Sequence, residues 1–133
     1  MDLIYRAADA LRRRFEPGGH GRMGEDVAHR YLRGRGCKVV ARNYRMRSGA
    51  GEIDLVAWHR EKLVFVEVKT RAGADFGEPE RAVDQEKQER LIRAGRDYAR
   101  RAGVEWDSTR FDIVSVVVER PRVRIEWIQD AFR

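Results

Sequence analysis

Cysteine is almost absent from this 133-residue chain, which contains Cys37 and no second cysteine. A disulfide within the chain is therefore impossible, which fits a reducing compartment, and we expect a cytoplasmic location. Cys37 lies where a strand should begin, which predicts a small buried side chain. The three histidines, at positions 20, 29 and 59, have no partner at metal-ligand spacing. The sequence therefore argues against a zinc site.

Long hydrophobic runs are also missing. No stretch approaches the roughly 20 apolar residues that cross a bilayer, so we expect no membrane association. The opening MDLIYRAADALRRRF lacks a long apolar core and a small-residue cleavage site, and it does not predict a signal peptide. It could form a short amphipathic helix over 2–14, but a loosely packed or partly disordered arm is favoured. We therefore expect an N-terminal extension, 1–21, and one domain, 22–133.

Acidic residues are missing from one long segment, Ala28 to Gly51. The same segment carries a series of basic side chains: Arg30, Arg33, Arg35, Lys38, Arg42, Arg45 and Arg47. The whole chain has a formal net charge of +6. A basic balance favours an anionic partner, with nucleic acid as the first candidate and a solvated, charge-rich surface as the simpler alternative.

The apolar pattern predicts a helix, three strands, a second helix and two more strands. The helices are expected over 22–35 and 84–102, the second capped by Asp84 and ended by Gly103. The strands are expected over 37–45, 52–58, 62–70, 109–119 and 123–128, with a tight turn, HREK, between the second and the third. This order predicts a mixed α/β sheet with helices packed on it.

The third predicted strand ends in an unusual pair of charges. After the apolar residues 63–66, Glu67 and Lys69 lie on the same strand face as Phe65, because side chains alternate. Asp54, on the preceding strand, lies beside Glu67 if the two strands pair as a hairpin. Two adjacent carboxylates repel unless a cation or a proton lies between them.

This combination of residues favours one kind of chemistry. Magnesium prefers oxygen ligands and often takes one or two carboxylates, with water and phosphate in the other positions. A nearby ammonium can orient the attacking water or stabilise charge on the phosphate. Asp54, Glu67 and Lys69 therefore indicate metal-assisted hydrolysis of a phosphodiester, against the commoner alternative of a surface ion pair.

The chain resembles the YraN-type family of small bacterial proteins in the motifs GEIDLVA, VFVEVKTR, FDIVSVVVE and WIQDAF, over about Arg22 to Phe132. That family is similar to the restriction-endonuclease-like, PD-(D/E)xK nuclease superfamily, and in particular to archaeal Holliday-junction resolvases. The resemblance implies a restriction-endonuclease-like mixed β-sheet flanked by helices, a Mg²⁺ or Mn²⁺ cofactor, and a DNA substrate that is branched or structured. It also implies a homodimer.

The superfamily pattern carries over residue by residue. Asp54 and Glu67 match its metal ligands, and Lys69 matches its catalytic lysine. Glu25 matches the helix-borne acid that often completes the metal site. On the predicted helix Glu25 borders the buried stripe, and the alternative is a first-turn acid that favours the helix dipole. Ile53 precedes Asp54 where the superfamily name has a proline.

Several other positions keep two interpretations. Glu52 either supports Asp54 or pairs with a nearby arginine. The tryptophans at 58, 106 and 127 are expected to pack rather than to stack on bases. Four arginines would contact backbone phosphates, with simple solvation as the alternative: Arg42, Arg45, Arg47 and Arg71.

A lysine interrupts the apolar stripe of the second helix. The stripe consists of Val83, Leu91, Ala94, Tyr98 and Ala102, and Lys87 recurs with it at spacings of three and four. Its side chain either reaches past the stripe to solvent or brings its ammonium to the carboxylates, where it would hold the scissile phosphate. The outer face is expected to carry Gln85, Glu86, Gln88, Glu89, Arg90 and Arg93.

The sequence therefore predicts a magnesium-dependent endonuclease that acts on DNA. The alternatives are a non-catalytic nucleic-acid-binding module that keeps the fold, and a subunit that needs a partner for activity. The set of Asp54, Glu67 and Lys69 disfavours the binding module, since binding alone needs none of them together. It does not separate the other two.

Overall fold

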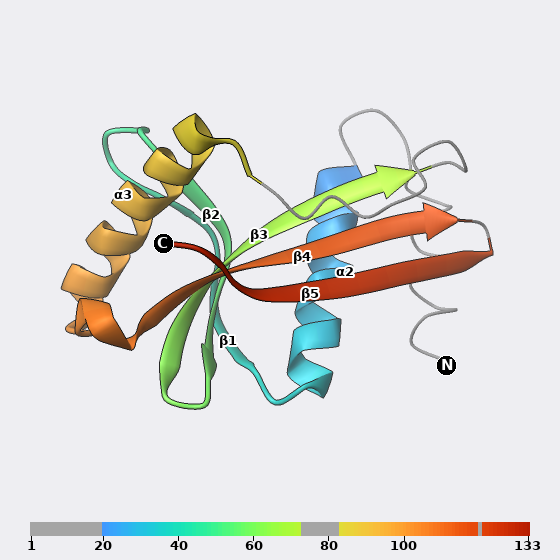
Figure 1. Ribbon diagram of the computed structural model, residues 1–133, viewed down its shortest axis with the longest axis horizontal. Helices are drawn as coiled ribbons and strands as arrows, with labels where there is room; N and C mark the ends of the chain where they lie inside the picture. The colour runs from blue at the N-terminus through green and yellow to red at the C-terminus, as the bar shows by residue number, and fades with distance from the viewer. Residues whose placement is uncertain (1–19, 73–82, 120) are drawn as a thin grey trace.

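The computed structural model describes residues 20–72, 83–119 and 121–133 (Figure 1). Residues 1–19 of the predicted extension 1–21, with its candidate helix, lie outside the described residues, and the last two residues of the extension belong to the first described helix. The helices are α2 (His20–Gly34) and α3 (Gln85–Ala102), with a short 3₁₀ helix, η2 (Trp106–Ser108). The strands are β1 (Lys38–Arg45), β2 (Glu52–His59), β3 (Lys62–Ala72), β4 (Thr109–Glu119) and β5 (Arg122–Phe132). The predicted order is confirmed, although β5 continues to Phe132 rather than ending at Ile128.

The strands form one sheet in the order β1-β2-β3-β4-β5. All neighbours pair antiparallel except β3 and β4, which are parallel. Parallel neighbours need a crossover connection, and α3 lies in that connection. Figure 1 shows α2 and α3 on opposite sides of the sheet. The protein is therefore a mixed α/β domain, consistent with the predicted restriction-endonuclease-like fold.

Each face of the sheet has its own core. On the α2 side, Val64 and Val66 pack with Leu55 and the helix residues, while Phe65 packs on the α3 side. The predicted alternation along β3 is therefore confirmed. On β2, strand alternation predicts that Ile53 and Leu55 share a face, but Ile53 packs in the α3-side core and Leu55 in the α2-side core.

The departure at Ile53 has a local cause. Gly51, just before β2, lies so close to α3 that a Cβ added there would come within 2.5 Å of the Arg90 carbonyl oxygen. The start of β2 is thus drawn against α3, and Ile53 is enclosed on that side.

Helix α3 begins and ends as predicted. Asp84 caps it by accepting a hydrogen bond from the Lys87 backbone N–H over 2.9 Å, and Gly103 ends it with φ of 70°. The stripe is partly confirmed: Leu91 and Ala94 are buried. Ala102 is exposed, because the chain turns at Gly103 and the last buried helical position belongs to Ala99.

Helix α2 approaches the sheet very closely at one point. A Cβ at Gly24 would lie 1.9 Å from the Thr70 side-chain oxygen on β3. A larger residue fits there only if the Thr70 side chain or the helix moves. Because Glu25 is the next residue, the close contact fixes its height above the sheet.

Candidate active site

The two predicted carboxylates meet where the β2–β3 ladder ends. Leu55 pairs with Val66, so the next step in register places Asp54 opposite Glu67. Beyond that pair the two strands are joined by a side-chain hydrogen bond instead of a backbone one, because the Val68 N–H donates to Asp54 Oδ2 over 2.8 Å. Asp54 is therefore held at β3, with its carboxylate on the face that α3 covers.

A cavity of about 200 Å³ opens at these carboxylates, between β2, β3 and the first turns of α3. Lys87 Nζ lies 2.6 Å from Glu67 Oε1. The Glu67 side chain is 5% exposed and the Lys87 side chain 38%. Of the two positions considered for Lys87, the structure has the one at the carboxylates; a catalytic role for it stays a prediction. The cavity is lined by Glu52, Asp54, Glu67, Lys87, Arg90 and Leu91.

The surroundings of Asp54 in the cavity raise its pKa into the neutral range. Burial, followed by the charge of Glu67, raises the pKa of Asp54 to about 7, and the Val68 hydrogen bond and the charge of Lys87 only partly oppose this. Burial lowers the pKa of Lys87, but its hydrogen bond and ion pair with Glu67 outweigh burial and leave that pKa raised. Lys87 is therefore an ammonium at neutral pH.

Glu25 lies near the site without lining the cavity. Its side chain is 14% exposed and lies 3.9 Å from Arg42. Burial raises the pKa of Glu25, while a hydrogen bond with Asn43 and the charge of Arg42 oppose that rise. Its charge in turn raises the pKa of Asp54, so the two carboxylates are within electrostatic reach. The first-turn alternative is wrong, since α2 begins at His20.

Lys69 follows Glu67 by two residues on β3 and is half-buried beside Ser115 of β4. Strand alternation places it on the same face as Glu67. The structure thus puts Asp54, Glu67 and Lys87 around one cavity, with Lys69 next along the strand and Glu25 on the neighbouring helix.

The four candidate phosphate-binding arginines do not share one environment. Arg42 lies 2.6 Å from Asp26, so its charge is already balanced. Arg45 lies 3.2 Å from Glu52, which confirms the interpretation of Glu52 as an arginine partner. Arg47 is exposed between β1 and β2, and Arg71 is half-buried on β3. A phosphate-binding role for these residues stays a prediction.

Arg90 is a cavity residue that sequence reasoning missed. It was expected on the outer face of its helix, but it is half-buried and lines the cavity. Its guanidinium also lies 3.1 Å from Glu86. The signal was present, because Arg90 follows Lys87 by three residues and such residues share a helix face.

The carboxylates fit a hard divalent cation. In the described parts of the chain no three His, Cys, Asp or Glu side chains are grouped so that they could hold a metal ion. Asp54 and Glu67 are therefore a two-carboxylate set. That number suits magnesium, which commonly takes one or two carboxylates and keeps water or phosphate in the other positions. The set does not suit zinc, which prefers nitrogen and sulfur ligands.

A second cavity, of about 290 Å³, lies near the C-terminal end of β5. Two of its cations already have partners: Arg133 pairs with Asp130 at 2.7 Å, and Lys62 donates to the Asp107 carbonyl at 2.7 Å. We therefore place the candidate site at the smaller cavity, where Asp54 and Glu67 meet. It is lined by Lys62, Trp106, Asp107, Thr109, Arg110, Phe111, Asp130, Phe132 and Arg133.

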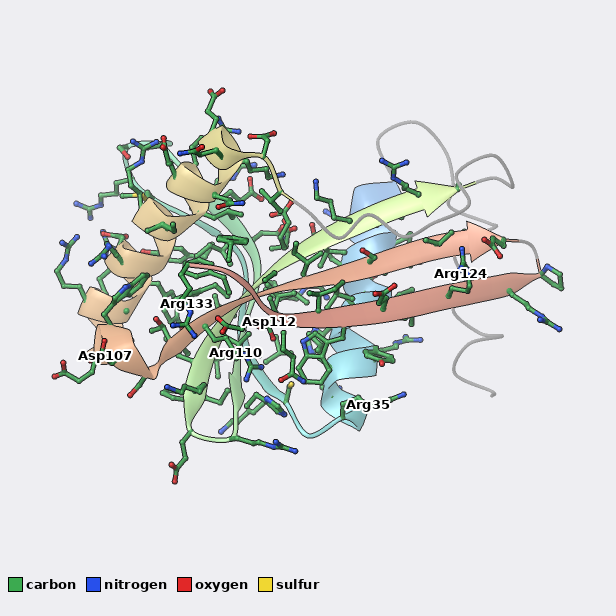
Figure 2. The ribbon with its side chains drawn as sticks, in the orientation of Figure 1. Arg35, Asp107, Arg110, Asp112, Arg124 and Arg133 are labelled. Carbon is green, nitrogen blue, oxygen red and sulfur yellow. The ribbon has the colours of Figure 1, made fainter. Side chains whose placement is uncertain are left out.

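A buried acid on β4 also escaped the sequence reasoning. Asp112 is fully buried and accepts hydrogen bonds from Arg110, from the Trp127 indole and from the Asp130 N–H. Figure 2 shows Arg110 and Asp112 side by side near the start of β4. A lone acid in the apolar run FDIVSVVV was the available signal, since buried charges need partners. Packing roles for Trp58, Trp106 and Trp127 are confirmed.

Comparison with known proteins identifies the family. The family model described as Uncharacterised protein family UPF0102 matches residues 24–116. A UPF0102 protein of Solibacter usitatus is 62% identical over 132 residues, covering 99% of both chains. A UPF0102 protein of Rhodococcus jostii is 43% identical over 113 residues, covering 84% of this chain and 94% of the relative. The chain belongs to the UPF0102 family, as the YraN resemblance indicated.

Neither described helix combines the length and the apolar content needed to cross a membrane.

Proposed function

We propose that this protein is a metal-dependent endonuclease that hydrolyses phosphodiester bonds in DNA. The observation that carries the proposal is the meeting of Asp54 and Glu67 on one sheet face, at a cavity that Lys87 and Arg90 also line. A protein gains no stability from placing two carboxylates together in a half-buried cavity. A metal-binding role explains the arrangement.

Each residue has a defined part in this proposal. Asp54 and Glu67 would hold Mg²⁺ or Mn²⁺, with Glu25 as a nearby acid that adds negative potential. A metal ion bound there would polarise the phosphate and make a bound water more acidic. Lys69 orients that water or stabilises charge on the phosphate. Lys87 and Arg90 face the cavity as cations for the scissile phosphate.

DNA is the proposed substrate because of the basic balance of the chain. The net charge of +6 and the acid-free segment 28–51 favour a polyanion. Exposed Arg47, together with Arg45 and Arg71 at the ends of β1 and β3, would contact backbone phosphates rather than bases. A branched or structured substrate and cleavage by a homodimer are parts of this proposal that follow from the family resemblance. Action in the cytoplasm is a further part, which follows from the single cysteine.

Cleavage assays on a four-way junction, a duplex and a single strand test the proposal. Mg²⁺ or Mn²⁺ should support cleavage, and excess chelator should abolish it. Lys69→Ala should lose cleavage and keep DNA affinity, because affinity comes from the basic surface and falls steeply with salt. Lys62→Ala, at the other end of β3, is the matched control and should cleave normally.

The outcomes separate the alternatives. Cleavage that persists in chelator contradicts the metal mechanism. Salt-sensitive DNA binding without cleavage by the pure protein favours a binding module, and activity restored by a cell extract favours a partner-dependent subunit.

A further inference from the structure

The Lys87 ammonium lies beside Glu67, at a position where the proposed metal ion would also bind. The Lys87 ammonium is 2.6 Å from Glu67 Oε1, the same carboxylate that the proposed function gives to a metal ion. A buried carboxylate needs a counter-ion whether or not a metal is present. Lys87 fills that need in the structure as it stands.

Of the two side chains in this ion pair, that of Lys87 is the more exposed to solvent. Glu67 is on a central strand and its side chain is 5% exposed, whereas the Lys87 side chain is 38% exposed. The Lys87 backbone is fixed, because its N–H donates to the Asp84 cap. Its four-carbon stem is flexible, so the ammonium can move while the helix stays in place.

A second positive group beside the same carboxylate would repel this ammonium. Two like charges at close range in a half-buried cavity destabilise each other far more than they would in water. Arg90 lies one turn further along α3 and also lines the cavity, so the ammonium cannot shift toward it without further repulsion. An anion in the cavity offers a displaced Lys87 a new partner.

We propose that Lys87 is an exchangeable internal counter-ion, which neutralises Glu67 before metal binds and is displaced onto the substrate phosphate when metal binds. The idea rests on the proposed function and deepens it. It makes metal and substrate binding mutually supportive, because the phosphate offsets the loss of the Glu67 ion pair. By linkage, each ligand then increases the affinity for the other.

The test is the affinity for Mn²⁺ of the full chain without nucleic acid, measured by titration calorimetry. Lys87→Met removes the competing ammonium and keeps the apolar stem, so Mn²⁺ should bind about tenfold more tightly or better. Lys62→Met is the matched control, since it removes one positive charge far from the carboxylates and should change the affinity by less than about twofold. Thermal melting checks that both variants fold.

Titration of the unmodified protein with Mg²⁺ provides a second measurement that needs no variant to fold. The Lys87 side-chain NMR signals should move toward those of solvent-exposed lysines as Mg²⁺ saturates the site, while the Lys62 signals stay in place. The Lys87 signals are assigned in the unmodified protein by through-bond correlation with the Lys87 backbone amide.

The outcomes distinguish this inference from the proposed function. Equal or weaker Mn²⁺ binding by Lys87→Met overturns the exchange and leaves the metal site intact. Lys87 signals that do not move at saturating Mg²⁺ also overturn it. No metal binding by any variant overturns both the exchange and the metal mechanism.

Discussion

Two buried acidic sites in this sheet balance their negative charge in different ways. Asp112 is fully buried, and its two oxygens accept hydrogen bonds from Arg110, Trp127 and the Asp130 backbone over 2.8 to 2.9 Å. At the other site Glu67 has the Lys87 ammonium, and Asp54 has the Val68 N–H. At the first site, which we call the closed site, hydrogen-bond donors of the protein surround the Asp112 carboxylate. The second brings together two acids at a cavity of about 200 Å³.

The difference indicates what each site is for. A carboxylate that is surrounded by donors stabilises the fold only as long as all its partners remain, and it has no capacity for a ligand. Two adjacent carboxylates beside one partly exposed cation retain that capacity. Burial and the charge of Glu67 disfavour ionisation of Asp54, whose pKa is raised to about 7. We therefore expect mutations at the first site to affect stability and mutations at the second to affect activity.

The largest expected effect is on catalysis. Glu67→Gln should lower the cleavage rate at saturating Mg²⁺ by about a thousandfold or more, equivalent to roughly 4 kcal/mol. The reason is the loss of an anionic metal ligand from the pair. The midpoint of thermal unfolding should change little, because Lys87 can reach solvent. Glu89→Gln, an exposed acid on α3, is the control, and a Glu67→Gln rate close to that of the control would contradict the assignment.

A substitution at the closed site, Asp112, should affect stability and leave the cleavage rate unchanged. Asp112→Ala should lower the free energy of unfolding by about 3 kcal/mol or more, because it leaves the half-buried Arg110 charge without its counter-charge and the Trp127 indole without its acceptor. The cleavage rate per folded molecule should stay unchanged. Urea denaturation measures the stability, and Asp107→Ala, an exposed acid nearby, should shift it by less than about 0.5 kcal/mol. A loss of cleavage without a loss of stability would erase the distinction between the sites.

The pH dependence of stability sharpens the comparison further. The pKa of Asp54 is about 7 in the folded protein against 3.8 as the ordinary value. Between these two pH values the folded state therefore holds a proton that the unfolded state has lost, so the free energy of unfolding of the metal-free protein decreases as pH rises from about 4 to about 7. Above pH 7 both states are ionised and the contribution is constant.

Asp54→Asn should remove this pH dependence. The free energy of unfolding of the variant minus that of the unmodified protein should increase from pH 5 to pH 8. The increase should be about 2 kcal/mol after allowance for solvent screening. Urea denaturation in chelator at the two pH values measures the gain. An equal effect of the substitution at both pH values would show that Asp54 does not titrate in this range.

The smallest expected effect concerns Lys87. Lys87→Met should lower the cleavage rate at saturating Mg²⁺ about tenfold, equivalent to 1.4 kcal/mol of transition-state stabilisation. The cause is the loss of a cation at the scissile phosphate, since the apolar stem is preserved. Lys62→Met serves as the control. An unchanged rate in a folded Lys87→Met protein would assign Lys87 to packing alone.

The sequence by itself determined the elements and their order. Asp84 and Gly103 carry their helix-ending chemistry in their own side chains and backbone preferences, so the limits of α3 were predictable. The alternation in β3 placed Phe65 and Glu67 on one face and Val66 on the other, because the strand period is a local property. Helical spacing likewise placed Lys87 on the side of α3 that faces the sheet.

Only the tertiary structure decided which charged groups meet. The partners of Asp112 come from β4 and β5, and Arg42 is balanced by Asp26 of α2. Such pairs depend on strand register and helix position, which local patterns do not contain. Glu25 is a case in point: its reach to Asp54 follows from the close contact of Gly24 with Thr70. The position of Lys87 at Glu67, rather than in solvent, was settled in the same way, because a long side chain takes the partner that packing places within its reach.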